Sequence, residues 1–210
     1  MGKEANGEKG DLSLRSYIHL DSLQPQVSSY IATTSRGFLP VPEEASLFIE
    51  IAPGIKINSL MDMALKATSV RPGILVVERA FGLLEVHHKD QGEVQQAGQE
   101  ILRQLELKET DRMKPRIVSE QILRGIEPDQ AALINRTRYG SMVLPGESLF
   151  ILETEPAGYI AFAANEAEKA ARITLNEMRV FGAYGRLWLS GPESEIDSAR
   201  EAAISALEAI

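Results

Sequence analysis

Apolar residues recur along the chain at two different spacings, which predict strands and helices in a fixed order. Short apolar runs and alternating residues predict strands, whereas apolar residues at i, i+3, i+4 and i+7 predict helices that bury one face. In the first half, strands are predicted at 14–20, 47–51, 74–77 and 83–86, and helices at 25–33, 57–65 and 94–105.

The same order returns in the second half of the chain. Strands are predicted there at 116–123, 149–152, 178–180 and 187–189, and helices at 128–135, 160–171 and 196–207. Pro25 and Pro128 each stand where the first turn of a helix begins, a position that suits proline. Each half therefore reads β, α, β, α, β, β, α. Helices mixed with hairpin-type strands predict an α+β fold, an antiparallel sheet with flanking helices.

The two halves are also similar residue by residue. Four residues of the first half, Val77, Ala80, Gly82 and Leu84, return as Val180, Ala183, Gly185 and Leu187, an offset of 103 residues (77 to 180). The tripeptide Leu47-Phe48-Ile49 returns as Leu149-Phe150-Ile151, an offset of 102 (47 to 149). We interpret the difference as one inserted residue between the two blocks.

This period predicts two domains. It exceeds the roughly 20–50 residues of solenoid units and has the size of one small domain. We expect a disordered tail at residues 1–13, a first domain at 14–111 and a second at 112–210. The charged segment from Lys108 to Pro115 would be the linker.

Composition excludes several classes of function. The net charge is −8 and there is no basic run, which argues against nucleic acid as a partner. No stretch approaches the roughly 20 apolar residues that span a bilayer. Cysteine is absent, as are the G-x-S-x-G, P-loop and H-E-x-x-H motifs. We therefore predict no catalytic residues, no metal, no cofactor and no enzymatic activity.

Two polar groups invite a chemical interpretation. His87 and His88 are consecutive at the end of a strand, so their side chains point to opposite sides, and a surface turn is favoured over a metal site. Glu153 and Glu155 share one strand face, but no base or nucleophile accompanies them. An enzyme that uses them as acid and base remains the weakest of three hypotheses.

The two halves differ at one turn between strands. The first half carries Glu78-Arg79 there and the second carries Phe181-Gly182. An adjacent acid and base in a tight turn fits a solvated ion pair, worth roughly 0–1 kcal/mol. A functional pair of opposite charges is the alternative.

Several sequence segments resemble those of the trimeric, tandem-domain bacterial microcompartment shell proteins of carboxysomes. They are LDSLQPQ at 20–26, SRGFLP at 35–40, VERAFG at 77–82, LINR at 133–136 and FILETEPAGY at 150–159. The resemblance runs from about Leu14 to Ile210. It implies that each half is a circularly permuted microcompartment domain of ferredoxin-like type.

The resemblance also implies an assembly and a role. Three chains would form a homotrimer, a pseudohexameric tile of the carboxysome shell in the bacterial cytoplasm, and two trimers can stack as a dimer of trimers. Other carboxysome shell proteins would be its neighbours. Phosphorylated sugars of carbon dioxide fixation, such as ribulose bisphosphate and phosphoglycerate, would pass its central pore. Glu78 and Arg79 would be the pore gate, and Phe181 and Gly182 would line the pore from the second copy.

Elementary electrostatics agrees with such a gate. Three Arg79 side chains around a threefold axis would repel, by about 1 kcal/mol per pair at about 4 Å in water and about 4 kcal/mol at a dielectric of 20. Interleaved Glu78 carboxylates would offset this repulsion, and turning Arg79 aside would open the hole. The alternative function is a soluble trimeric regulatory protein that binds a small molecule and belongs to no shell.

Overall fold

The computed structural model describes residues 12–210, which form two halves with the same order of strands and α-helices. The first half consists of β1 (Ser13–Leu20), α1 (Pro25–Thr34), β2 (Ala45–Ala52), η1 (Gly54–Lys56), α2 (Ile57–Ala67), β3 (Arg71–Glu78), β4 (Phe81–His88) and α3 (Gln91–Leu105). A short helix, η2 (Glu109–Asp111), lies in the predicted linker. The predicted tail lies outside the described residues except for its last two positions, and Ser13 already belongs to β1.

The second half repeats the first. It consists of β5 (Arg116–Leu123), α4 (Pro128–Thr137), β6 (Ser148–Glu155), α5 (Tyr159–Ala170), β7 (Thr174–Arg179), β8 (Gly185–Gly191) and α6 (Glu193–Glu208). Each half contains one four-stranded antiparallel sheet, with the strand orders β1-β2-β4-β3 and β5-β6-β8-β7. The predicted α+β fold and element order are therefore confirmed. Within residues 12–210, no helix combines the length and apolarity that crossing a bilayer would need.

The sheets of the two halves keep one offset of 103 residues, so the residue inferred from sequence to be inserted after Ile49 is wrong; the offset falls to 102 only at the last helix, where Val94 and Ala97 correspond to Ile196 and Ala199. β2 and β6 begin at 45 and 148, again 103 residues apart. Leu47 pairs with Val86, and Phe150 pairs with Leu189. Phe150 therefore corresponds to Leu47 and not to Phe48. A shift of one residue moves a side chain to the other face of a sheet, so the similar tripeptides face opposite ways.

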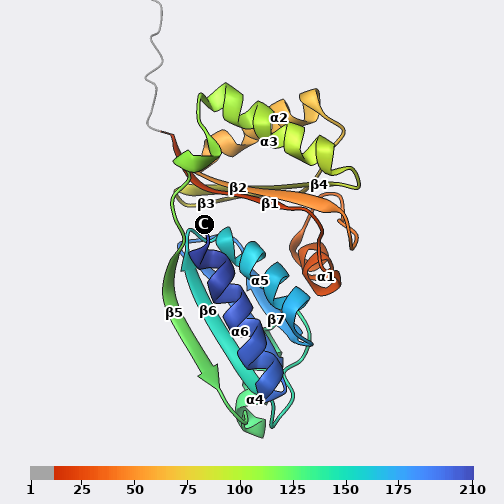
Figure 1. The fold of residues 1–210 in the computed structure, drawn as a ribbon, viewed down its shortest axis with the longest axis vertical. Helices are drawn as coiled ribbons and strands as arrows, with labels where there is room; N and C mark the ends of the chain where they lie inside the picture. The colour runs from red at the N-terminus through yellow and green to blue at the C-terminus, as the bar shows by residue number, and fades with distance from the viewer. Residues whose placement is uncertain (1–11) are drawn as a thin grey trace, which may run out of the picture.

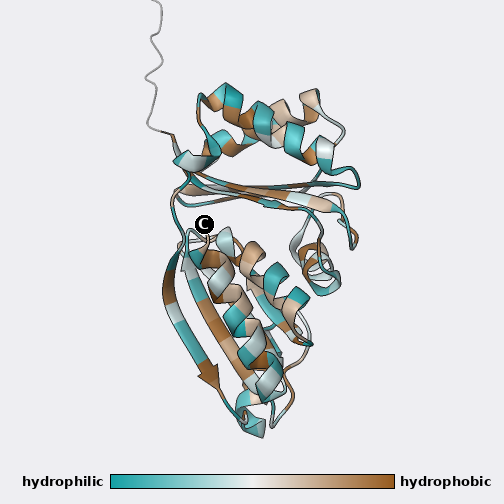
Figure 2. Cartoon of the chain, viewed as in Figure 1, coloured by the Kyte–Doolittle hydropathy of each residue, from teal (hydrophilic) through white to brown (hydrophobic). Residues whose placement is uncertain are grey.

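The first sheet is covered on both faces. Figure 1 shows α2 and α3 on one side, and α1 with α5 on the other. The cluster under α2 and α3 contains Leu47 and Ile49. Phe48 points the other way and joins a core that also contains residues of the second half. Hydrophobic residues also colour much of β6 beneath α6 (Figure 2). Sharing a core stabilises both halves, each of which would be small alone.

Helix α1 reaches across to the second half and is held there by α5. The carboxylate of Glu168 accepts the backbone N–H groups of Gln26 at 2.9 Å and Val27 at 3.0 Å. Asn165 Oδ1 accepts the N–H of Gln24 at 2.9 Å. These N–H groups at the start of a helix have no partner within it, and a negative charge there also suits the helix dipole.

A buried carboxylate joins the first sheet to the start of α5. Glu50 is 1% exposed, and it accepts bonds from Arg15 Nε at 2.7 Å and from the N–H of Gly158 at 2.8 Å. Burial raises the pKa of Glu50, and the bonds from Arg15 and Gly158 oppose that rise.

Candidate functional site

The turn between β3 and β4 is tighter than predicted. Glu78 pairs with Phe81, so only Arg79 and Ala80 lie outside the strands. The five-residue turn expected at 78–82 is wrong, because Phe81 and Gly82 already belong to β4. Arg79 is exposed and has φ 54°, in the left-handed region that a two-residue hairpin turn requires.

The corresponding connection in the second half is longer. Five residues, 180–184, separate β7 from β8, and Arg186 lies inside β8. Gly182 corresponds to Arg79 at the offset of 103 and also has a positive φ, 112°. That backbone conformation favours glycine, since it lacks a Cβ. Phe181 lies beside it and is half-buried.

The structure brings the turn and the loop together. A Cβ atom placed on Gly182 would lie 3.6 Å from Glu78 Oε1. Glu78 Oε2 lies 3.5 Å from Arg179 Nη2, at the end of β7. Within residues 12–210, Arg79 forms no hydrogen bond or ion pair. Glu78, Phe181 and Gly182 therefore lie close together, but the cation paired with Glu78 is Arg179 and not Arg79.

Arg179 is the residue that our sequence analysis missed. Its guanidinium lies 5.2 Å from the centroid of the Phe181 ring, within the range of a cation–π contact. Val76 holds the equivalent position in the first half at the offset of 103. Arg179 is thus another position where the two copies differ in charge, and a residue-by-residue comparison of the copies could have found it.

Two hollows border the turn and the loop. One of about 590 Å³ runs along β3 past Leu75 and Val77 to Phe181. The other, of about 330 Å³, lies beside Phe181 and Arg179 and is also lined by Arg36.

The two histidines do not lie together in a surface turn. His87 is 1% exposed, and its Nδ1 lies 3.2 Å from Glu85 Oε1. The same oxygen accepts a hydrogen bond of 2.6 Å from the Ser46 hydroxyl. His88 Nδ1 accepts the N–H of Asp90 at 3.0 Å. The surface interpretation is wrong for His87, because its sheet face is covered by the rest of the chain. The described residues contain no group of three or more His, Asp or Glu side chains that could hold a metal ion.

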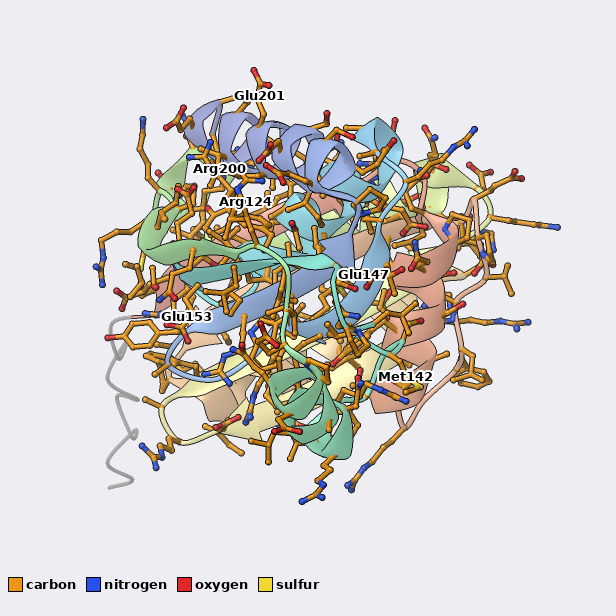
Figure 3. The ribbon with its side chains drawn as sticks, turned by 90° about the horizontal axis from the view of Figure 1, so that it is seen from below. Arg124, Met142, Glu147, Glu153, Arg200 and Glu201 are labelled. Carbon is orange, nitrogen blue, oxygen red and sulfur yellow. The ribbon has the colours of Figure 1, made fainter. Side chains whose placement is uncertain are left out.

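The two glutamates of β6 are paired with arginines. Glu153 accepts Arg186 Nη2 at 3.0 Å, and Glu155 is paired with Arg116. Figure 3 shows Glu153 at the periphery of the molecule, away from Arg200. Arginine stays protonated and cannot act as a base, so neither ion pair supplies the base or nucleophile that the enzyme hypothesis lacked.

The comparisons with known proteins identify the family. The model of the CsoS1D N-terminal domain matches residues 14–111. The chain is 56% identical over 198 residues to the carboxysome shell protein CsoS1D of Hydrogenovibrio crunogenus, covering 94% of this chain and 97% of that protein. The chain belongs to the CsoS1D/CcmP family of carboxysome shell proteins. The carboxysome shell protein CcmP of Synechococcus elongatus is 54% identical over 197 residues, 94% of this chain and 92% of that protein.

Solved structures agree with this CsoS1D/CcmP assignment. The fused permuted hexameric shell protein MSM0275 of the RMM microcompartment matches with TM-score 0.92 at 46% identity, covering 94% of this chain and 97% of that one. The double-ringed trimeric shell protein MSM0271 matches with TM-score 0.92 at 39% identity, covering 95% and 98%. The expected tandem permuted microcompartment fold is confirmed. The CsoS1D/CcmP relatives are shell proteins and not enzymes, as the sequence indicated.

Proposed function

We propose that this CsoS1D/CcmP family member is a gated tile of the carboxysome shell. Three chains would form a pseudohexameric ring around a pore for phosphorylated sugars such as ribulose bisphosphate and phosphoglycerate. We place its two domains at residues 14–111 and 112–210. The observation that carries the proposal is the contact between the two halves. Each of its two surfaces has a copy elsewhere on the chain that nothing within residues 12–210 covers.

The first unpartnered surface is α4. In the first half, α1 packs against α5 and β7, and Tyr30 on α1 is only 3% exposed. Leu133 holds the equivalent position on α4 and is 63% exposed. An α4 that docked as α1 does would bury this side chain.

The second unpartnered surface lies on α2 and β3, which correspond to α5 and β7. Its apolar side chains are half exposed, with Leu65 at 39%, Leu75 at 37% and Val77 at 44%. The hollow of about 590 Å³ runs along this surface. We infer that α4 of a neighbouring chain lies there.

The outer face of the second sheet completes this contact. Ile151 and Trp188 lie on it, at the positions that Phe48 and Glu85 hold on the covered face of the first sheet. Glu153 corresponds to Glu50, which binds the start of α5 within the chain. In the trimer, Glu153 would bind the start of η1 in the next chain.

Repeating one head-to-tail contact gives a ring when the rotation closes and a filament when it does not. Because each chain supplies two domains, a pseudohexameric ring of six domains must close after three chains. Because the β3–β4 turn touches the 180–184 loop within each chain, closure would place three copies of each alternately around the axis.

The rim of such a pore has the chemistry of a gate. Each exposed Arg79 would face two others across the axis, and their repulsion would be relieved by Glu78 or by rotation away from the axis. Two arrangements separated by a few kcal/mol are what a ligand-biased equilibrium needs. Arginine also binds phosphate oxygens in a bidentate manner, which fits phosphorylated sugars.

Electron cryomicroscopy of the assembled protein tests this function. We expect trimers in which Glu78 and Arg79 line a central hole, side-by-side packing of trimers, and stacking of two trimers face to face. Trimers whose β3–β4 turns face the outer solvent would refute the gate. Discrete trimers that never pack laterally with shell proteins would favour the soluble regulator instead.

A further inference from the structure

We infer that Arg179 is a third member of the gate. Arg179 holds the Glu78 carboxylate against the 180–184 loop of the second half, and Arg79 is then left unpaired. This inference rests on the proposed pore and adds to it a residue that sets both the position of the gate and its charge. The equilibrium at the rim is then a competition of two arginines for one carboxylate.

The geometry around Glu78 carries this assignment. Glu78 lies 3.5 Å from Arg179, and its carboxylate stands against Gly182, 3.6 Å from where a Cβ atom of that residue would lie. The ring of Phe181, 5.2 Å from the Arg179 guanidinium, gives that guanidinium a second contact. Arg179 is therefore held from two sides, whereas Arg79 extends from a two-residue turn with no partner among residues 12–210.

The strength of the contact suits a reversible switch. Glu78 is 34% exposed and Arg179 is 47% exposed. An ion pair between such exposed groups changes the ratio of the paired to the unpaired arrangement by no more than about fivefold. Arg79 is adjacent to Glu78 in the chain and can compete for it on similar terms. A ligand or a neighbouring chain needs little differential affinity to change the outcome.

Arg179 also changes the charge of the rim. Glu78 and Arg79 together are neutral, and Arg179 adds one positive charge, so these three residues carry +3 in a trimer, with the acid Glu177 two residues before Arg179 on β7. A cationic rim concentrates anions at the entrance. Because Val76 stands at the equivalent position of the first half, the added cations would alternate around the ring.

The test compares two matched variants, Arg179→Gln and Arg103→Gln. Arg103 is 68% exposed on α3 and pairs with Glu100, so its loss changes the net charge equally but away from the loops. Cryomicroscopy of assembled trimers would give the share of chains in which Glu78 contacts Arg79, and calorimetry with inorganic pyrophosphate would give anion affinity.

We expect Arg179→Gln to raise the ratio of Glu78–Arg79 contacts to free Arg79 by up to about fivefold and to weaken pyrophosphate binding. Arg103→Gln should change neither. Arg179→Lys keeps the charge and should preserve most of the anion affinity, but it lacks the planar group that stacks on Phe181.

The same data separate the two proposals. Wild-type trimers whose turns do not meet at the axis would refute the pore itself. Turns that meet at the axis, with the same Glu78 position and the same pyrophosphate affinity in Arg179→Gln as in wild type, would refute only the role of Arg179.

Discussion

Replacing Leu133 with alanine should weaken the trimer while leaving the fold of the single chain intact. The side chain is 63% exposed on α4, so it contributes little to the stability of an isolated chain. In the proposed ring it takes the place that Tyr30, 3% exposed, occupies within the chain. Its loss would therefore act only on association between chains.

The expected magnitude follows from the buried surface. Burying a leucine side chain contributes about 2 kcal/mol, and roughly two thirds of that remains to be gained from an exposed Leu133. Alanine keeps part of it, so each contact should lose about 1 kcal/mol, and a ring has three contacts. The total of about 3 kcal/mol lowers the association constant of the trimer roughly 100-fold, at about 1.4 kcal/mol per factor of ten.

Sedimentation equilibrium measures this constant, and thermal unfolding at a dissociating concentration measures the fold. Leu144→Ala is the matched control. Leu144 is 53% exposed, and its equivalent in the first half, Val41, stays 54% exposed although the contact between the halves is formed there. Leu144 should therefore stay exposed in the ring as well. We expect Leu144→Ala to leave association unchanged. Equal trimer affinities for Leu133→Ala and wild type, or a lowered melting temperature of the dissociated Leu133→Ala chain, would refute the reasoning.

Three further predictions concern the gate and the contact between halves. Replacing Glu78 and Arg79 together with alanine should leave trimers intact but without a closed pore by cryomicroscopy; a pore that still closes would argue against the gate. Gly182→Ala should destabilise the chain by more than about 1 kcal/mol, because φ is 112° there; an unchanged denaturant midpoint would show that the loop adapts freely. Burial raises the pKa of Glu50 in the folded chain above that in the unfolded chain, so its titration favours folding below about pH 4.5 and disfavours it as pH rises through the folded pKa. The unfolding free energy of wild type relative to Glu50→Gln should therefore fall between pH 4 and pH 7, and a relative rise would contradict the account.

Periodicity and proline placement predicted the element order and the fold well, because both are local signals. The alignment of β2 with β6 failed for a physical reason. Leu47-Phe48-Ile49 and Leu149-Phe150-Ile151 are apolar at every position, and an uninterrupted apolar run has no alternation that could fix its register.

The candidate site was located from sequence only in part. The difference between Glu78-Arg79 and Phe181-Gly182 located the two connections that the structure brings together. The partner of Glu78 depends on how the halves pack, which neither half encodes alone. The burial of His87 was missed for the same reason, because the second half and α1 cover a sheet face that looked free.

The most direct test of the ring is cross-linking between the two surfaces that the chain leaves unpartnered. The protein contains no cysteine, so Leu133→Cys and Leu75→Cys introduced together would supply the only thiols. Their equivalents, Tyr30 and Met178, lie together in the within-chain contact. After reaction with a short bis-maleimide, we expect closed covalent trimers as the largest product on a denaturing gel. An absence of cross-linked chains, or a ladder that continues beyond three chains, would contradict the account.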